Sequence, residues 1–292
     1  MPAPAPDRIV FATESITIGA FRCPPTHPLF RDSGPIRDDC FVFPRTTVEI
    51  RHPNARPFVA DPTIVTLYNR QQQYERRSVC GDGDRCDWYA VTPDVLRGAL
   101  RRRDPAAAED ARPIRFTHAL ADPATYLAQR RLFVAAARAG TDPVDPLRIE
   151  EAVVLLLDRV LARAYGGTRR DSAPPRRASR ALDLADAAKG WMAPRIASRL
   201  TLARIAGALD CSIFHLCRSF RRATGMTLHG YREQVRVRVA LERLEGGDHE
   251  LSRLALDLGY SSHSHFTSGF KRAFGATPSQ ARQTLTGRRA SF

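Results

Sequence analysis

The chain has 292 residues, enough for two domains with separate hydrophobic cores. Its formal net charge of +14 is unevenly spread, because residues 1–175 hold 25 basic and 22 acidic side chains whereas residues 176–292 hold 20 and 9. Six cysteines in a chain of this length do not suggest a disulfide scaffold, and no apolar run reaches the ~18 residues of a membrane-spanning helix. The first residues, MPAPAPDR, lack the order of a secretory signal, so we expect a cytoplasmic protein that does not enter a membrane.

The first third of the chain has the pattern of short β-strands. From residue 9 to about residue 90, β-branched and aromatic residues form short runs that Pro, Gly and Asp interrupt. The runs are residues 16–18, 41–43, 46–50, 58–59 and 64–68. This pattern predicts an all-β barrel or sandwich. Residues 1–8, with alternating Pro and Ala, are expected to form a leader without regular structure.

Helical patterns follow residue 93 and are clearest at residues 123–139 and 147–165. In the second of these segments, residues 153–157 are apolar all round, so most sides of that helix must be covered. Packing within the domain and contact with a second subunit are both open explanations. Residues 166–178 are rich in Gly, Pro and Arg and are expected to link two domains, the second of which begins with a helix at residues 182–192.

A repeated helix-turn-helix pattern occupies most of residues 201–282. In its second copy Leu251, Leu254 and Leu258 form the apolar stripe of a short helix, Gly259 ends that helix, and Ser261 or Ser262 can cap the next one. The aromatic side chains expected to point inward from the next helix are Phe266, Phe270 and Phe274. Its outer face carries side chains with hydrogen-bond donors: His263, Ser264, Thr267, Ser268 and Lys271. Such a helix suits the major groove of DNA, although a plain amphipathic helix has the same pattern.

The first copy of the pattern spans residues 201–220. Its apolar stripe consists of Leu202, Ile205, Ala206 and Leu209. Residues 210–212 form the turn, and Ser212 is the expected cap of the following helix. In that helix the residues expected to face the core are Ile213, Leu216 and Phe220, and those expected to project outward are Phe214, Cys217, Arg218 and Arg221. Two copies, whose second helices start 50 residues apart, point to DNA binding much more specifically than one.

The segment between the two copies, residues 229–244, predicts a helix about 24 Å long. Outside its apolar faces, this helix is expected to be strongly basic, because it carries four arginines: Arg232, Arg236, Arg238 and Arg243. A rigid rod of this kind can hold two recognition helices near one turn of DNA apart, about 34 Å. We therefore hypothesise that one subunit reads two adjacent major-groove segments.

Two runs of residues, IFHLCRSFRRATGMTLHGYREQVRVRVALERL and LALDLGYSSHSHFTSGFKRAFGATPSQAR, resemble the DNA-binding domain of AraC/XylS-family transcription regulators. The resemblance implies an α+β protein with an N-terminal cupin-like β-barrel with helices, followed by an all-α domain of two helix-turn-helix units. The implied domains are a sensor and dimerisation domain at 9–165, a linker at 166–178 and a DNA-binding domain at 179–286. In the N-terminal half the resemblance is limited to the general pattern of short strands.

The resemblance also implies partners and contact residues. The partners are double-stranded DNA, an unknown small-molecule effector, a second copy of the chain in a homodimer, and RNA polymerase, with activation as the expected outcome and no cofactor. The contact positions that it implies are Phe214, Cys217, Arg218, Arg221, His263, Ser264, Thr267 and Ser268, with Lys271 directed to phosphate. Arg218 suits bidentate contact with guanine, and a phosphate clamp is the alternative. His265 is expected to pack between helices rather than to read bases, and the small hydroxyl at Ser268 predicts less stringent reading by the second unit.

The N-terminal half also has thiols and an imidazole at short spacing, namely Cys23, His27, Cys80 and Cys86. The spacings match no standard zinc knuckle or ribbon, and the His-x-His group of a catalytic cupin is absent. Unrelated thiols are one interpretation, and zinc or thiol-redox sensing is another. The alternatives to a regulator that responds to a small molecule are thus a metal- or thiol-responsive regulator, a cupin enzyme fused to a DNA-binding domain, and an alkyl-acceptor repair protein. No nucleophile or phosphate-loop motif is present, so an enzyme is not expected.

Overall fold

The computed structural model describes residues 5–32, 34–139, 144–167, 176–247 and 250–286. The chain divides into two compact units, Met1–Ser172 and Ala173–Phe292. Of the linker predicted at 166–178, residues 168–175 lie outside the described residues, and the remainder belongs to the ends of helices α4 (Pro146–Gly167) and α5 (Arg176–Met192). None of the helices in the described ranges is long and apolar enough to cross a bilayer.

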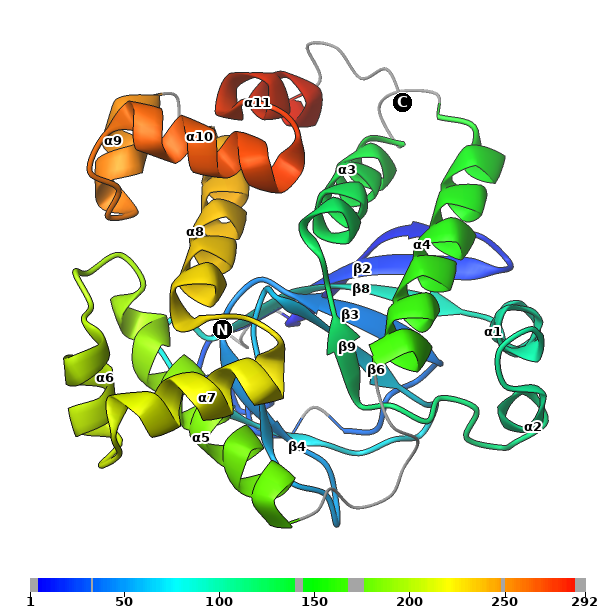
Figure 1. Cartoon of the computed structure of the whole chain (residues 1–292). Coiled ribbons are helices and arrows are strands. Elements are labelled where there is room, and N and C mark those ends of the chain that lie inside the picture. The colour runs from blue at the N-terminus through cyan, green and yellow to red at the C-terminus, as the bar shows by residue number, and fades with distance from the viewer. Residues whose placement is uncertain (1–4, 33, 140–143, 168–175, 248–249, 287–292) are drawn as a thin grey trace. The chain divides into compact units, whose positions relative to one another are not determined.

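The first unit contains two antiparallel sheets (Figure 1). The six-stranded sheet has the order β1 (Asp7–Ala12), β2 (Ile16–Cys23), β8 (Asp84–Val91), β3 (Cys40–Pro44), β6 (Ile64–Tyr68) and β9 (His118–Leu120). The three-stranded sheet has the order β5 (Phe58–Ala60), β4 (Val48–Arg51) and β7 (Glu75–Ser78). The strands predicted from the alternating pattern are confirmed. β1 begins at Asp7, inside the predicted leader, and β7, β8 and β9 were not among the predicted runs.

The predicted closed barrel is not formed, because the described strands pair within two separate sheets and no ladder joins one sheet to the other. β3 and β4 follow one another in the sequence but lie in different sheets. Pro44 ends β3, and a proline has no N–H with which to continue a ladder. The coarser prediction, a sheet-rich N-terminal region followed by a helical domain, is confirmed.

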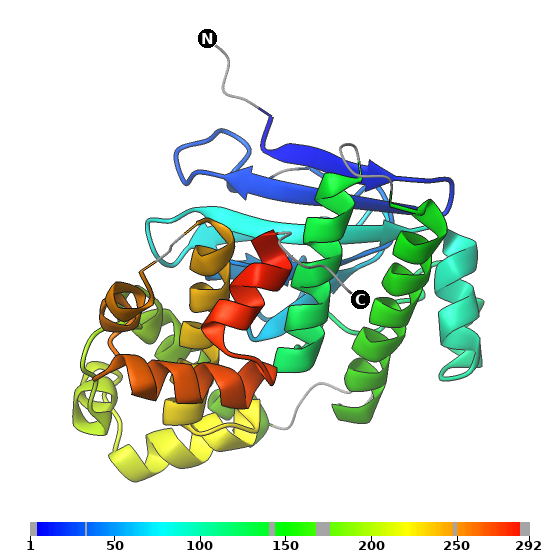
Figure 2. The ribbon, with the colours of Figure 1, turned by 90° about the horizontal axis from the view of Figure 1, so that it is seen from above.

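The core of this unit lies between the sheets and under two helices. Apolar residues of the small sheet, among them Val48, Ile50 and Phe58, pack against Cys23 and Ile64 of the large one. Figures 1 and 2 show α3 (Pro123–Arg138) and α4 side by side over one face of the large sheet. Both helices confirm the predictions for residues 123–139 and 147–165. Two short helices, α1 (Pro93–Arg101) and α2 (Pro105–Ala108), complete the unit.

A buried polar cluster ties α3 to the sheet. The Gln129 amide donates to Asp87 Oδ2 over 2.6 Å, Arg130 pairs with the same carboxylate, and the Tyr89 hydroxyl donates to the Gln129 carbonyl over 3.0 Å. A buried carboxylate is stable only when it is paired and hydrogen-bonded, so this cluster fixes α3 at one position on β8.

Helix α4 is covered on one face only within its unit. Val153, Leu156 and Leu157 are buried, as expected for packing within the domain. Leu147 and Leu155, by contrast, are exposed, Leu155 to 55%. The domain therefore covers most of the apolar residues of this helix and leaves Leu147, Val154 and Leu155 exposed.

The second unit is all-α. After α5 and a short 3-10 helix (Ala193–Arg195) come α6 (Leu202–Ala208), α7 (Ile213–Thr224), α8 (Leu228–Glu245), α9 (Leu251–Asp257), α10 (His263–Phe274) and α11 (Pro278–Thr286). The predictions for residues 182–192, 229–244 and both helix-turn-helix copies are confirmed as helices. The core around α7 includes Leu216, Phe220 and Tyr231, together with Ala188 and Met192 of α5.

Candidate nucleic-acid interface

The second helix of each helix-turn-helix copy begins and ends in the same way. Ser212 Oγ accepts from the His215 N–H over 3.2 Å at the start of α7, and Ser262 Oγ accepts from the His265 N–H over 3.1 Å at the start of α10. Each cap satisfies an N–H that has no partner inside its helix. Gly225 ends α7 and Gly275 ends α10, both in the left-handed region at φ 72°. The two helices are therefore fixed by equivalent local signals.

The turns before these helices have one left-handed residue each, at Asp210 (φ 47°) and Gly259 (φ 77°). The prediction that Gly259 ends the first helix of the second copy is confirmed, since α9 ends just before it. A Cβ atom at Gly259 would also lie 1.9 Å from the carbonyl oxygen of Ala197, far inside van der Waals contact. Position 259 therefore requires glycine for two independent reasons, conformation and space.

The inner faces of α7 and α10 are apolar and buried. In α7, Leu216 and Phe220 are buried as predicted, and the Phe220 ring meets Tyr231 edge-on at 5.4 Å. In α10, the rings of Phe266, Phe270 and Phe274 follow one another at 5.8 and 4.8 Å and are buried, as predicted. Aromatic contacts of this kind hold each helix against its core.

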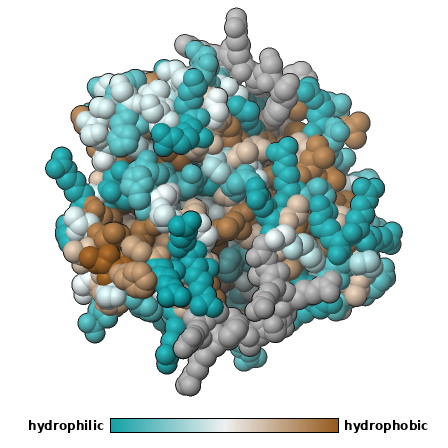
Figure 3. Space-filling model, in the orientation of Figure 1, coloured by the Kyte–Doolittle hydropathy of each residue, from teal (hydrophilic) through white to brown (hydrophobic). Residues whose placement is uncertain are grey.

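One assignment to the core of α7 is wrong. Ile213 is 45% exposed, because it is the first residue after the Ser212 cap and its side chain projects before the helix reaches the core. With Leu202 of α6 and Phe214 it forms an exposed apolar surface, which Figure 3 shows as brown on the left over α6 and α7.

The outer face of α7 combines one aromatic ring with cations. Phe214 is 73% exposed, and Arg218 and Arg221 are exposed beyond it. Cys217 is only half exposed, because it packs against the core. Arg222, which the sequence reasoning missed, is also exposed, and its spacing of four residues from Arg218 could have placed it on this face.

The outer face of α10 carries small hydroxyls and imidazoles. His263, Ser264, Ser268 and Lys271 are exposed, whereas Thr267 is half-buried, with its hydroxyl 3.5 Å from His263 Nε2. The expectation that His265 packs between helices is wrong. Its side chain is exposed and stands edge-on to the Tyr260 ring at 5.4 Å, because the capping turn at 261–262 turns it outward.

Helix α8 connects the two helix-turn-helix copies as a single rod. Figure 1 shows α6 and α7 at one end of α8 and α9 and α10 at the other. Figure 2, turned by 90°, shows α7 and α10 along the same edge of this unit. The recognition helices α7 and α10 therefore lie on one side of α8, and each has an exposed outer face.

The arginines of α8 do not form the exposed basic surface that the sequence suggested. Arg236 is 4% exposed and donates to the carbonyl oxygens of Ile196 and Ala197 over 2.9 and 3.3 Å. Arg238 is buried as well, and Arg243 pairs with Asp257 of α9 over 2.8 Å. Arg232 also donates to the Ile196 carbonyl, and burial, followed by the charge of Arg236, lowers the pKa of its guanidinium. Periodicity alone could not reveal these partners, because carbonyl acceptors come from a distant loop.

Both recognition helices, by contrast, carry exposed positive charge. Within the part of the chain that the structure describes, Arg218, Arg221 and Lys271 form no ion pair. Each recognition helix also carries two basic residues in its last turn, where they complement the helix dipole: Arg221 and Arg222 in α7, and Lys271 and Arg272 in α10. Unpaired cations at these positions are available to phosphate groups.

The thiols of the first unit are not gathered into one site. All six cysteines of the chain are free, and the described residues contain no group of three His, Cys, Asp or Glu side chains placed to hold a metal ion. Burial raises the pKa of the Cys23, Cys80 and Cys86 thiols, so each stays protonated at neutral pH. His27 lies in the turn after β2, where its Nδ1 accepts from the Leu29 N–H. Reactive and metal-binding cysteines need the thiolate, so these features favour structural thiols.

Two helix-turn-helix copies of this geometry define the class of protein as a helix-turn-helix DNA-binding protein. Residues 205–284 match the helix-turn-helix domain family. The chain is similar to regulatory protein SoxS of Escherichia coli, with 34% identity over 95 residues that cover 32% of this chain and 89% of SoxS. The chain belongs to the AraC/XylS family of DNA-binding transcription regulators.

Two other relatives match a similar share of the chain but less of their own length. The bifunctional transcriptional activator/DNA repair enzyme AdaA of Bacillus subtilis is 33% identical over 85 residues, which are 29% of this chain and 40% of AdaA. The transcriptional activator RhaS of Escherichia fergusonii is 30% identical over 102 residues, 35% of this chain and 36% of RhaS. The crystal structure of ToxT from Vibrio cholerae aligns with 94% of this chain and all of ToxT, at 12% identity and a TM-score of 0.38, too low to support a conclusion.

Proposed function

We propose that the protein is an effector-responsive transcription activator in which one subunit reads two adjacent major-groove segments of DNA. The observation that carries this proposal is the repeated unit: α7 and α10 have the same caps, the same buried inner face and an exposed polar outer face, on one side of α8. Helix α8 has 18 residues and is about 27 Å long. That length suits two helices held about 34 Å apart, one turn of DNA.

The residues proposed to contact DNA divide by chemistry. On α7, Arg218 is proposed to donate to O6 and N7 of a guanine, and Phe214 to pack on the methyl group of a thymine. Arg221 is proposed to bind phosphate, and half-buried Cys217 to contact the backbone at the edge of the site. The proposed contacts of α10 are His263, Ser264, Thr267 and Ser268 with bases and Lys271 with phosphate. Short hydroxyls reach fewer acceptors than arginine, so we propose that α10 reads sequence less stringently.

The same proposal assigns roles to the whole chain. Residues 9–165 form the sensor and dimerisation domain, 166–178 the linker and 179–286 the DNA-binding domain. A homodimer is proposed to form through the exposed side of α4, where Leu147, Val154 and Leu155 are apolar. The activator would contact RNA polymerase at its promoter and, because its ligand is chromosomal DNA, act in the cytoplasm.

The alternative functions have less support. A metal- or thiol-responsive regulator needs clustered ligands or low-pKa thiols, whereas burial raises the pKa of the thiols of the first unit. The chain matches 40% of the length of AdaA, so this match gives little support to a repair function. We therefore place the function in DNA recognition.

Selection of binding sites from random DNA by the full-length protein tests the proposal. The selected site is expected to contain two conserved segments about one helical turn apart, and binding should exceed that of scrambled DNA at physiological salt by at least about a thousandfold. Gel shifts at several salt concentrations separate this specific binding from phosphate attraction. Equal affinity for selected and scrambled DNA at every salt concentration would contradict sequence reading.

A further inference from the structure

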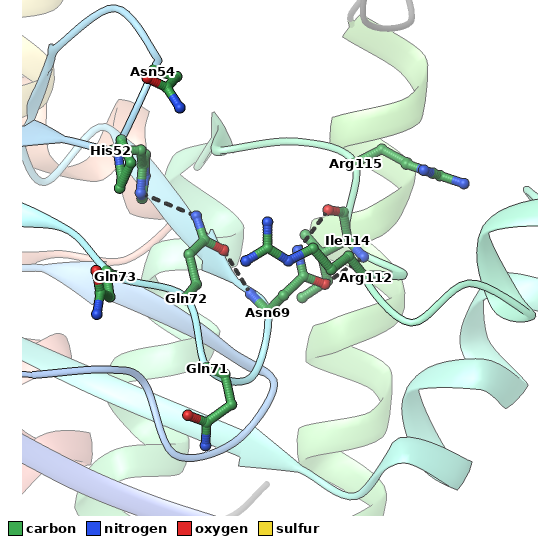
Figure 4. A pocket seen from close by; sticks show the side chains of 10 residues that line it. His52, Asn54, Asn69, Gln71, Gln72, Gln73, Arg112, Ile114 and Arg115 are labelled. Atoms are coloured by element: carbon green, nitrogen blue, oxygen red, sulfur yellow. Dashed lines mark hydrogen bonds between the residues drawn. The ribbon is translucent and has the colours of Figure 1, made fainter.

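The first unit has a pocket that the DNA-binding function does not use (Figure 4). It has a volume of about 430 Å³ and lies where the chain leaves β4, where it turns from β6 to β7, and along the segment before β9. Five of its ten lining residues are Asn or Gln, two are Arg, and none is Asp or Glu. A cavity with many neutral hydrogen-bonding groups and only positive charge favours polar ligands that carry a negative charge.

One wall of the pocket is held rigid by a chain of side-chain hydrogen bonds. The buried Asn69 amide donates to the Ile114 carbonyl over 2.9 Å and accepts from the Ile114 N–H over 2.9 Å. Gln72 Oε1 accepts from the Asn69 N–H over 2.9 Å, and Gln72 Nε2 lies 3.0 Å from His52 Nδ1. Three segments that are distant in sequence are thus joined through two amides. Rigid support of this kind is what a binding site requires.

The backbone at the rim of the pocket is unusual. Asn54 and Gln71, which both line the pocket, adopt the left-handed conformation at φ 59° and 63° without being glycine. Only three non-glycine residues in the described part of the chain do so. Such conformations are costly and recur at ligand-binding positions, and here two of them occur in residues that line one pocket.

The charge of the pocket comes mainly from Arg112. Arg112 is exposed and forms no ion pair with any residue of the described ranges, and Figure 4 shows it reaching over Asn69 toward Gln72. Arg115 points away and pairs with Asp110 over 2.9 Å. Burial lowers the pKa of His52, so that its imidazole is neutral at neutral pH. A single available guanidinium beside neutral amides suits one anionic group and several hydroxyls.

We propose that this pocket binds a small anion that also carries hydroxyl groups. Arg112 pairs with the carboxylate or phosphate group, because a guanidinium binds either in a bidentate manner. The Asn and Gln side chains, which donate and accept, bond the hydroxyl groups. This inference rests on the proposed effector-responsive function, and it assigns the effector both a site and a chemical class.

The pocket is connected to α4 through the packing of Ile114. Ile114, whose backbone Asn69 holds, borders a small internal space together with Leu157 and Leu161 of α4. An anion drawn to Arg112 acts on the segment that carries Ile114 and thereby on the packing of α4. That helix carries the exposed apolar face proposed to join two subunits. On this proposal, packed side chains connect ligand binding to the geometry of the proposed dimer.

Calorimetric titration of the full-length protein tests the proposal with three probes: D-gluconate, D-glucose 6-phosphate and neutral D-glucose. We expect at least one of the two anions to bind, D-glucose to bind at least about tenfold more weakly, and Arg112→Gln to weaken the anion by at least about tenfold. Gluconate binding alone would identify a carboxylate ligand, and binding of the phosphate ester alone would identify a phosphate ligand. Arg97→Gln is the matched control, because Arg97 is an exposed arginine of α1 that pairs with Asp94 outside the pocket.

Three results would overturn the proposal: no binding of either anion, equal binding of D-glucose, or unchanged affinity in Arg112→Gln. Gel shifts of the same proteins on a selected DNA site keep this outcome separate from the function itself. If only the pocket proposal fails, wild-type and Arg112→Gln proteins still bind that site. If the proposed function fails, specific DNA binding is absent whatever the calorimetry gives.

Discussion

The two helix-turn-helix copies share a frame and differ in what they present. Ser212 and Ser262 cap α7 and α10 in the same way, and Gly225 and Gly275 end them at the same φ. Caps and buried aromatics thus fix the backbone of both copies, while most of the outer residues are exposed to solvent. Those residues are a phenyl ring and guanidinium groups on α7, and hydroxyls and imidazoles on α10. On the proposed function, the repeated frame positions the two helices on DNA, and the outer residues determine which bases each helix reads and how strictly.

The largest expected effect concerns the turn at Gly259, which cannot accept a side chain. Gly259→Ala is expected to lower the free energy of unfolding by about 3 kcal/mol or more, because its methyl group would meet the Ala197 carbonyl at a positive φ. Gly275→Ala is the matched control, with the same sign of φ and no atom within 4 Å, and it should cost about 1 kcal/mol. Urea unfolding followed by circular dichroism measures both, and equal losses would show that space at position 259 does not matter.

The next effect separates the outer rows of the two helices. Arg218→Ala is expected to weaken binding to the selected site by about 1–3 kcal/mol and to relax one base position. Lys271→Ala should weaken binding to every sequence alike, because phosphates carry no sequence information. Gel shifts at fixed salt on selected and scrambled DNA measure both variants. Equal losses on the two DNAs for Arg218→Ala would leave Arg218 as a phosphate clamp.

The shared frame predicts equal effects at the two caps. Ser212→Ala and Ser262→Ala should each lower the free energy of unfolding by about 1 kcal/mol, because each leaves a helix N–H without its acceptor. Ser252→Ala, at an exposed position inside α9, provides the control and should change stability little. A loss at one cap only, measured by thermal unfolding, would show that the copies are not equivalent.

The smallest effect tests the aromatic ring of α7. Replacing thymine by deoxyuridine removes one methyl group, which should weaken binding by about 0.8 kcal/mol at the position under Phe214. The same replacement should have no effect on Phe214→Ala protein. If the variant is as sensitive as the wild type, the ring does not meet a thymine methyl group.

Most of the frame could be predicted from the sequence, and much of the surface could not. Helix periods, Ser caps and the glycine at position 259 are local signals, and the structure confirms each of them. The closed barrel was not confirmed, because alternation predicts strands but not which sheet each strand joins. Ile213 was assigned to the core and is exposed, because an apolar residue in a first helical turn can precede the core.

Arg236 shows most clearly what sequence patterns cannot reveal. Its spacing places it on a polar face of α8, yet it is buried, because the Ile196 and Ala197 carbonyls accept its hydrogen bonds and Tyr260 packs on its guanidinium at 5.2 Å. The pocket beside Arg112 was missed for the same reason, since it is assembled from segments far apart in the sequence. Contacts between residues far apart in the sequence determine both the burial of Arg236 and the formation of the pocket.

Interference footprinting of the full-length protein on its selected site tests most directly whether α7 and α10 enter adjacent grooves. Guanine N7 methylation should block binding in two patches about 10 base pairs apart on one face of the duplex. Arg218→Ala should remove sensitivity in one patch and His263→Ala should alter only the other. If both substitutions changed the same patch, or if a single patch were found for each subunit, the two helices would not read DNA side by side.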